Sequence, residues 1–444
     1  MSPIKISRKN SGYANVALAM RLFALASVGL SLTAHAADPV VFSFATVGDS
    51  RQDPSSPDPT TLLPNNTGAL LLQDKQFLQN SKAFARILRS VQSQKVNLFI
   101  ENGDLIMGYG RASVPSVVPS SATVAVNSDL VKFYTQYAFW RGMVANTFET
   151  GTYTLPVPGN HETQCNSAVS TNGQAAYLAP TCSSGKHGYA ENEDAYRANV
   201  GDLINDLSVN QRFQTVTGVA PQSPNGLTTA TAPVASANNG PITSDQSQMS
   251  YSFDISTSIG LLHFTVVNTD PAGADATAPT DWLAADLAAA KGRGAVKLFV
   301  FGHKPAFTYN YAAASGGTVA AAGLDANANI ALRNAFWSVI TQYGATYFCG
   351  HEHVFNIAQY ADPLSVYAGT PYQVLVGSGG SPFDDKLVGT CPACSEPVFT
   401  NPTDRYYVWA TVQVHQSGRV SLKAFGFSDT FGPTQLVQTI NNLQ

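Results

Sequence analysis

The sequence predicts an α/β fold whose buried strands end beside one functional site. Apolar runs typical of buried strands alternate with segments in which apolar residues recur at helical spacing. Three successive apolar runs lead into Gly48-Asp49, Gly103-Asp104 and Gly159-Asn160-His161. Open α/β sheets place their chemistry at the carboxyl ends of strands, so we expect these three strand ends to form a site.

The composition points to a single enzyme-sized domain. The chain has 444 residues, a length at which an α/β enzyme can be one domain with insertions. Charged residues make up 12% of the chain, about half the usual share. The net charge of -4 offers no basic surface for nucleic acid and no polybasic patch for an anionic membrane. We expect one catalytic domain over 37–444, with a loop-rich insertion at about 163–250 and no indication of oligomeric state.

The N-terminus is typical of a secretory signal peptide. Basic residues precede an apolar run at 22–32, and Ala34-His35-Ala36 follows as a small-residue cleavage site. We therefore expect cleavage after Ala36 and a periplasmic or secreted mature protein. Translation could start at Met1 or at Met20, because Met20-Arg21 would open a signal of ordinary length. The apolar run is too short to span a bilayer, so no stable membrane anchor is expected.

Five cysteines in an exported protein fit two disulfides and one free thiol. The favoured local pairings are Cys391 with Cys394 and Cys165 with Cys182, which leave Cys349 buried and free. The C-x-x-C motif could also be redox-active or half of a zinc site. A structural disulfide is favoured because no second C-x-x-C occurs and the surroundings are rich in proline.

The first half of the chain alternates strands with helices. The order is strand 40–47, helix 75–94, strand 96–100, a helix around 130–143 and strand 153–157. Beyond these elements, a helix is expected at about 191–209. The Thr-, Ala-, Pro- and Ser-rich segment 214–248 predicts an extended surface loop.

The second half repeats the pattern and supplies histidines. The predicted elements are strands 249–255 and 261–267, helix 282–290, strand 296–301, helix 329–343, strand 345–348 and closing strands 372–376, 406–414 and 420–427. His303 follows the strand at 296–301, and Gly350-His351-Glu352-His353 follows the strand at 345–348. The Ala- and Gly-rich segment 312–323 is expected to be mobile near the site. His263 lies within an apolar strand and is expected to be a hydrogen-bonded core residue.

The strand ends offer metal ligands of one chemical kind. The candidates are Asp49, Asp104, Asn160, His161, His303, His351 and His353. Oxygen and imidazole donors without thiolate suit Zn, Fe, Mn or similar ions. Even six ligands from these seven candidates exceed the needs of one catalytic ion, which keeps positions open for water and substrate. Two ions that share a carboxylate are therefore expected, and such a pair can clamp a phosphoryl group and activate a hydroxide.

The five strand-end blocks, in this order, resemble those of the calcineurin-like metallophosphoesterase superfamily, closest to its purple acid phosphatase branch. The resemblance spans about residues 40–425. It implies a four-layer α-β-β-α sandwich with two mixed sheets. It also implies an exported dinuclear phosphoesterase in which metal-bound hydroxide attacks a small-molecule phosphate ester.

The resemblance also implies a role for each residue. Asp104 would bridge two divalent or trivalent ions. One ion would be completed by Asn160, His303 and His351, and the other by Asp49 and His353. His161 would not be a ligand and would protonate the leaving oxygen or stabilise charge on the phosphoryl group.

Two positions depart from the family pattern. Many members carry D-x-H in the first block, where this chain has Arg51, whose permanently protonated guanidinium cannot coordinate a metal. Purple phosphatases use a tyrosine three residues after the second aspartate, where this chain has Met107. Arg51 is read either as a bidentate clamp on substrate phosphate or as a salt-bridge partner of Asp53 or another acid.

Two alternative functions remain open. A 5'-nucleotidase or nucleotide phosphodiesterase ranks lower because no second nucleotide-binding domain is evident in the sequence. A catalytically silent binding protein of the same fold is also possible, but retention of the strand-end blocks argues against it.

Overall fold

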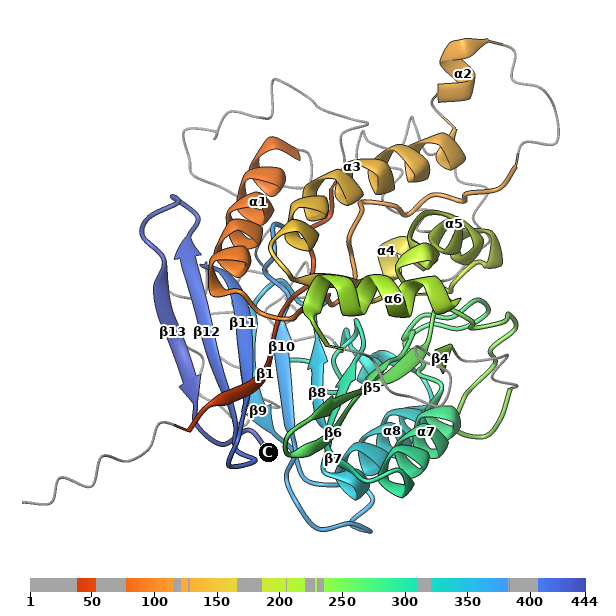
Figure 1. Ribbon diagram of the computed structural model, residues 1–444. Coiled ribbons are helices and arrows are strands. Elements are labelled where there is room, and N and C mark those ends of the chain that lie inside the picture. Colours follow the sequence, from red (N-terminus) through yellow and green to blue (C-terminus); the bar gives the residue numbers. More distant parts are fainter. Residues whose placement is uncertain are drawn as a thin grey trace, which may run out of the picture. The chain divides into compact units, whose positions relative to one another are not determined.

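In the computed structural model, the described residues lie between Asp38 and Gln444 (Figure 1). The residues that it describes are 38–52, 77–114, 121–126, 128–165, 186–204, 206–219, 228–229, 235–309, 321–381, 383 and 406–444. The predicted signal peptide, Asp53, three of the cysteines (Cys182, Cys391 and Cys394) and the Ala-rich segment up to residue 320 lie outside these residues. None of the described helices is long and apolar enough to cross a membrane.

The described strands form two sheets. The six-stranded sheet has the order β13-β12-β11-β1-β2-β3, and the seven-stranded sheet has the order β4-β5-β6-β7-β8-β10-β9. The first sheet consists of β1 (Val40–Val47), β2 (Leu98–Glu101), β3 (Tyr153–Pro156), β11 (Tyr406–His415), β12 (Val420–Ser428) and β13 (Gln435–Ile440). The second consists of β4 (Thr228–Thr229), β5 (Tyr251–Thr257), β6 (Gly260–Val266), β7 (Ala295–Phe301), β8 (Thr346–Cys349), β9 (Phe355–Gln359) and β10 (Tyr372–Val376).

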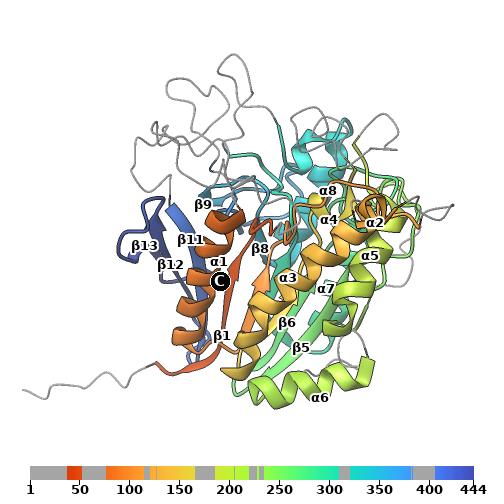
Figure 2. The same cartoon turned by 90° about the horizontal axis from the view of Figure 1, so that it is seen from above.

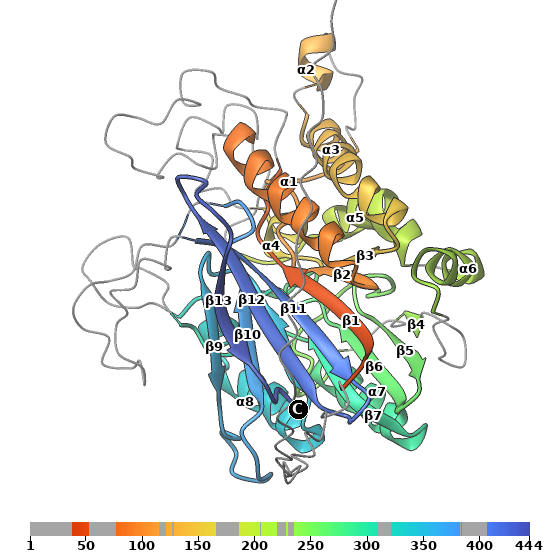
Figure 3. The same cartoon turned by 60° about the vertical axis from the view of Figure 1, so that its left-hand side comes forward.

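Both sheets are mixed, as predicted. In the first sheet β1, β2 and β3 run parallel, whereas β11 pairs antiparallel with β1 and β12. In the second sheet β6, β7, β8 and β10 run parallel, and β5 and β9 are antiparallel to their neighbours. Figure 3 shows β1 beside β11, although they lie near opposite ends of the described chain.

Helices cover the outer face of each sheet. The helices are α1 (Phe77–Gln94), α2 (Ala122–Val126), α3 (Asp129–Glu149), α4 (Asn160–Thr163), α5 (Ala190–Val200), α6 (Asp206–Thr217), α7 (Thr280–Gly292) and α8 (Ile330–Tyr343), with 3-10 turns η3 (Gly201–Leu203) and η4 (Leu324–Ala326). Helices α1 and α3 contact the first sheet, and α7 and α8 pack with the second sheet (Figures 1 and 2). The layers are therefore helix, sheet, sheet and helix, which confirms the predicted fold class.

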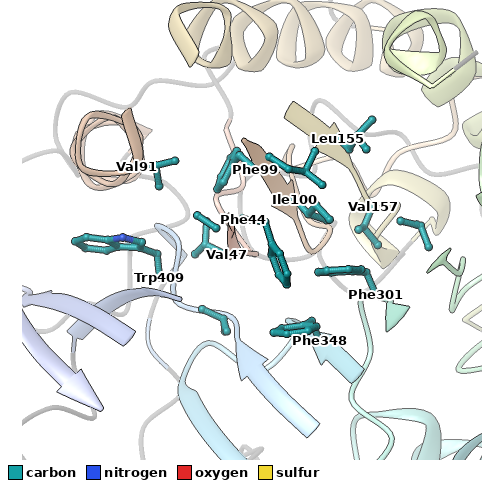
Figure 4. Packing of buried hydrophobic residues seen from close by; sticks show 14 of the residues in the cluster. Phe44, Val47, Val91, Phe99, Ile100, Leu155, Val157, Phe301, Phe348 and Trp409 are labelled. Atoms are coloured by element: carbon teal, nitrogen blue, oxygen red, sulfur yellow. The ribbon is translucent and has the colours of Figure 1, made fainter. Parts of the chain in front are cut away.

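Phenylalanines fill the space between the sheets. Phe44 of β1 is fully buried, and its ring packs edge-on against four rings of the second sheet at centroid distances of 5.1 to 5.7 Å. These rings belong to Phe264, Phe299, Phe301 and Phe348. Figure 4 shows Phe44 directed toward Phe301 and Phe348. Each such pair contributes about 0.5–1.5 kcal/mol beyond area burial, so this core holds the two sheets together.

The structure departs from the sequence predictions in two places. The helix predicted at about 191–209 is two helices separated by η3, and α6 continues to Thr217, into the predicted loop 214–248. The reason is tertiary: Phe213 of α6 is fully buried against Tyr153 and Phe253. The sequence also predicts neither β9 nor β13, whose side chains are mostly only partly buried or exposed.

Candidate metal centre

The loops that follow five strands bring the predicted site residues together. Strands β1, β2 and β3 deliver Asp49, Asp104 and Asn160 from the first sheet, and β7 and β8 deliver His303 and His351 from the second. Backbone hydrogen bonds join the loops, such as Asp49 N to Gly103 O at 2.9 Å and Gly350 N to His303 O at 2.8 Å. The side chains open onto a cavity of about 350 Å³ that Arg51, Asp104, Asn160, His161, His351 and His353 line in part.

The backbone at the site is strained and crowded. Asp49, Asp104 and His351 have positive φ angles of 65°, 55° and 73°, a conformation that costs a non-glycine residue on the order of 1 kcal/mol or more. A Cβ atom at Gly350 would collide with the Asp49 carboxylate, and one at Gly159 would collide with the backbone nitrogen of Asp104. The glycines of the sequence motifs are thus needed for close approach of the loops.

A first group of side chains, the four-donor cluster, consists of Asp104, Asn160, His303 and His351. His303 Nδ1 donates to the carbonyl oxygen of Asn102 at 2.7 Å, which leaves Nε2 of a neutral ring with a lone pair. This Nε2 lies 2.8 Å from Asn160 Oδ1, 3.1 Å from Asp104 Oδ1 and 3.2 Å from His351 Nδ1. Neither the amide nor the carboxylate oxygen carries a proton, so a cation or a proton on Nε2 must separate these atoms. The donor set fits Zn, Fe or Mn.

The charges in the four-donor cluster are strongly coupled. Burial alone lowers the pKa of His303, but the charge of Asp104 overcomes this effect and raises the pKa to about 9. Burial and the neighbouring His303 lower the pKa of His351 well below its usual range. A proton on His303 therefore takes the place of a cation, and metal binding must displace it.

A second group, the three-donor cluster, consists of Asp49, Asp104 and His353. One ligand atom from each of these residues lies within 4.8 Å of the others. Asp49 Oδ2 accepts from the backbone of His351 at 2.8 Å, whereas the buried Oδ1 accepts no hydrogen bond from the described residues. Burial raises the pKa of Asp49 well above its usual range. Because an unsatisfied buried carboxylate oxygen is costly, its presence fits a site built for a cation.

Asp104 belongs to both clusters. Burial opposes its ionisation, but His161 and His303 together hold the pKa of Asp104 well below its usual range. Its Oδ1 faces His303, and its Oδ2 lies 3.6 Å from His161 Nε2. The bridging role that the resemblance implies for Asp104 remains a prediction.

Arg51 lies inside the site. Its Nε donates to Ser381 Oγ at 2.6 Å, and Nη1 donates to His161 Nε2 at 3.2 Å. Its Nη2 lies 2.6 Å from Nε2 and 3.1 Å from Nδ1 of His353. The predicted alternative partner Asp53 is outside the described residues.

His161 lies beside the clusters as a neutral ring. Its Nδ1 donates to the carbonyl oxygen of Met107, the residue at the position of the family's tyrosine. Burial lowers the pKa of His161 to about 3. With Nδ1 protonated, Nε2 is the acceptor for Arg51. The predicted role of His161 as a proton donor remains a prediction.

Two residues that contact the site residues, Tyr109 and Glu162, received no role from the sequence. The ring of Tyr109 packs against His161 with ring centroids 3.6 Å apart and the planes tilted by 34°. Its hydroxyl accepts from Asn160 Nδ2, which turns Asn160 Oδ1 toward the four-donor cluster. Its signal in the sequence is Gly108-Tyr109, soon after the Gly103-Asp104 block. Glu162 accepts from the backbone nitrogens of Asp104 and Gly159 at 2.9 and 2.7 Å. Its carboxyl therefore ties two of the site loops together.

Two predictions outside the site are confirmed. Cys349 is buried and free. His263 is a hydrogen-bonded core residue, with Nδ1 2.6 Å from Asp254 Oδ1 and Nε2 2.9 Å from Asp286 Oδ2. The disulfides remain predictions, because at least one cysteine of each pair lies outside the described residues.

Comparisons with known proteins find similarity only among solved structures. No family model and no curated protein matches the chain. A purple acid phosphatase from yellow lupin (Lupinus luteus) seeds is 11% identical, with a TM-score of 0.45, over 90% of this chain and 53% of that chain. The chain thus spans about half the length of that phosphatase.

Two further solved structures are similar at the same level. A dimetal phosphatase from Danio rerio is 11% identical, with a TM-score of 0.39, over 90% of this chain and 99% of that chain. PhoD is 10% identical, with a TM-score of 0.44, over 91% of this chain and 73% of that chain. Similarities of this size identify neither a substrate nor a reaction for this chain.

Proposed function

We propose that this protein is an exported, metal-dependent phosphoesterase that acts on small-molecule phosphate esters in the periplasm or outside the cell. One observation carries the proposal: His303 Nε2 faces Asn160 Oδ1 and Asp104 Oδ1 at 2.8 and 3.1 Å, an arrangement that calls for a positive charge between them, which a bound metal ion supplies when it displaces the proton on Nε2. The cavity beside these atoms also contains the guanidinium of Arg51. A metal donor set next to a guanidinium suits a phosphate group. Export is supported by the N-terminal sequence.

Two metal ions are proposed, with Asp104 between them. The four-donor cluster would hold one ion and the three-donor cluster the other. When bound, such ions supply positive charge for a phosphate and lower the pKa of water, so that a nucleophile forms at neutral pH.

The chain's own side chains would orient the ester. Arg51 offers N–H groups in a planar fork that matches two phosphate oxygens. Tyr109 holds Asn160 and packs on His161, so these side chains keep one orientation. His161 Nε2 lies 3.2 Å from Arg51 Nη1, so His161 is placed to contact the same phosphate or its leaving oxygen.

The proposal is tested with the purified protein by metal analysis and by hydrolysis of a nitrophenyl monoester and the bis-nitrophenyl diester. Asp104→Ala and His351→Ala should abolish turnover and lower the metal content. Asp194→Ala and His187→Ala are matched controls outside the clusters and should change neither turnover nor metal content. Turnover that survives Asp104→Ala or His351→Ala contradicts the site assignment. Wild-type protein without metal and without turnover supports the silent binding protein.

A further inference from the structure

The two donor clusters differ in their surroundings. The four-donor cluster contains two imidazoles, an amide and a carboxylate, and the described hydrogen bonds of His303 go to Asn102 and Asn160. In the three-donor cluster, Arg51 Nη2 lies 2.6 Å from Nε2 of His353. This same Nε2 is 3.6 Å from Asp49 Oδ1, so Arg51 contacts the imidazole nitrogen that faces the aspartate.

The position of Arg51 is built into the fold. Its side chain is only 6% exposed, and its backbone nitrogen donates to Asp104 O at 2.8 Å. Ser381 accepts from Arg51 Nε and donates to the carbonyl oxygen of Asp49 at 2.7 Å. The backbone of Arg51 is thus anchored to Asp104, and its guanidinium is anchored to Ser381, which itself binds the backbone of Asp49.

A guanidinium at this place opposes a metal ion in two ways. Each unprotonated imidazole nitrogen has one lone pair, so a nitrogen that accepts from Arg51 cannot bind an ion at the same time. Arginine also remains protonated at all ordinary pH values, and its positive charge repels a cation bound nearby.

We infer that Arg51 makes the two metal sites unequal. The four-donor cluster binds the first ion tightly. The three-donor cluster binds its ion weakly, because that ion must displace Arg51 from His353. The inference rests on the metal sites of the proposed function. It adds that the four-donor cluster fills before the three-donor cluster and that Arg51 sets this order.

The test is calorimetric titration of the metal-free, full-length protein with Zn²⁺ alone. Wild type should show one tight equivalent and a second that is at least about tenfold weaker, as expected for a like charge at contact distance. Arg51→Ala removes the charge, and Arg51→His adds a donor, so both should tighten the second equivalent at least about tenfold. Arg51→Lys keeps the charge and should leave the second site weak.

Two further variants locate the effect. Arg141→Ala removes an arginine that pairs with Asp202 away from the site and should leave both equivalents unchanged. Arg51→Ala combined with His353→Ala should lose the gained affinity, because the gain requires the three-donor cluster. The tight first equivalent reports in every variant that the site loops are folded.

Several results would overturn the inference. Two equally tight equivalents in wild type contradict it without any variant. The inference is also contradicted if Arg51→Ala leaves the affinity for the second Zn²⁺ equivalent unchanged or lowers it. It is equally contradicted if Arg51→Lys raises that affinity as much as Arg51→Ala does. Failure of the proposed function looks different, since wild type would then bind no metal and hydrolyse no ester.

Discussion

Replacement of Asp49 by asparagine separates stability from function. Asp49 Oδ1 is buried without a hydrogen bond from the described residues, and an unsatisfied buried polar atom costs about 1–3 kcal/mol. Asp49→Asn keeps the shape and an oxygen that can accept from the His351 backbone, but it removes the buried charge. We therefore expect the metal-free variant to be more stable than wild type by about 1–3 kcal/mol near pH 8, while ester hydrolysis is lost.

The pH dependence of this difference has a defined sign. The folded pKa of Asp49 is raised by burial, so wild type loses stability as pH rises from the unfolded pKa of about 3.9 toward the folded pKa. The difference in the free energy of unfolding between variant and wild type should be small at a pH near the unfolded pKa of about 3.9 and should grow as pH rises. Urea unfolding in the presence of a chelator measures it, with the exposed Asp194→Asn as control. A metal-free Asp49→Asn protein that is less stable than wild type near neutral pH refutes the reasoning.

Three other changes have defined outcomes. Tyr109→Phe removes the hydroxyl that orients Asn160, and kcat/KM should fall roughly tenfold with unchanged circular dichroism, whereas an unchanged rate would rule out this orienting role. His161→Ala should lower kcat roughly 10²–10⁴-fold at constant metal content, and metal loss would make His161 a ligand. Asp254 and Asp286 overcome burial and raise the pKa of His263, so its stabilisation is complete below about pH 6.5 and lost as pH rises through the raised value. His263→Gln should therefore cost more stability in urea unfolding at low than at high pH, and an equal cost at both would contradict this.

The individual elements were predictable because their signals are local. Strands β1, β2, β7 and β8 are buried runs of apolar residues, and helices α1, α3, α7 and α8 carry apolar residues at helical spacing. Helix α6 was less predictable because its boundary depends on Phe213, which packs against Tyr153 and Phe253 from other elements. Strands β9 and β13 escaped prediction because their exposed positions leave little apolar pattern.

The composition of the site followed from the same local signals. Each glycine-containing block comes directly after a strand, and parallel strands bring their carboxyl ends to one edge of a sheet. This reasoning places Asp49, Asp104, Asn160, His303 and His351 together, as the structure does. It could not assign Tyr109, whose contact with Asn160 spans 51 residues of sequence.

By itself the sequence determined which donors reach the site, because a strand and the turn after it are specified by neighbouring residues. The resemblance of its motifs to the superfamily also predicted how those donors would be divided, with Asp104 shared. Only the tertiary structure decided where Arg51 lies: it contacts the nitrogen of His353 that faces Asp49. Arg51 and His353 are 302 residues apart and come from different sheets. Their contact depends on how the two sheets pack, and no local pattern of residues encodes that.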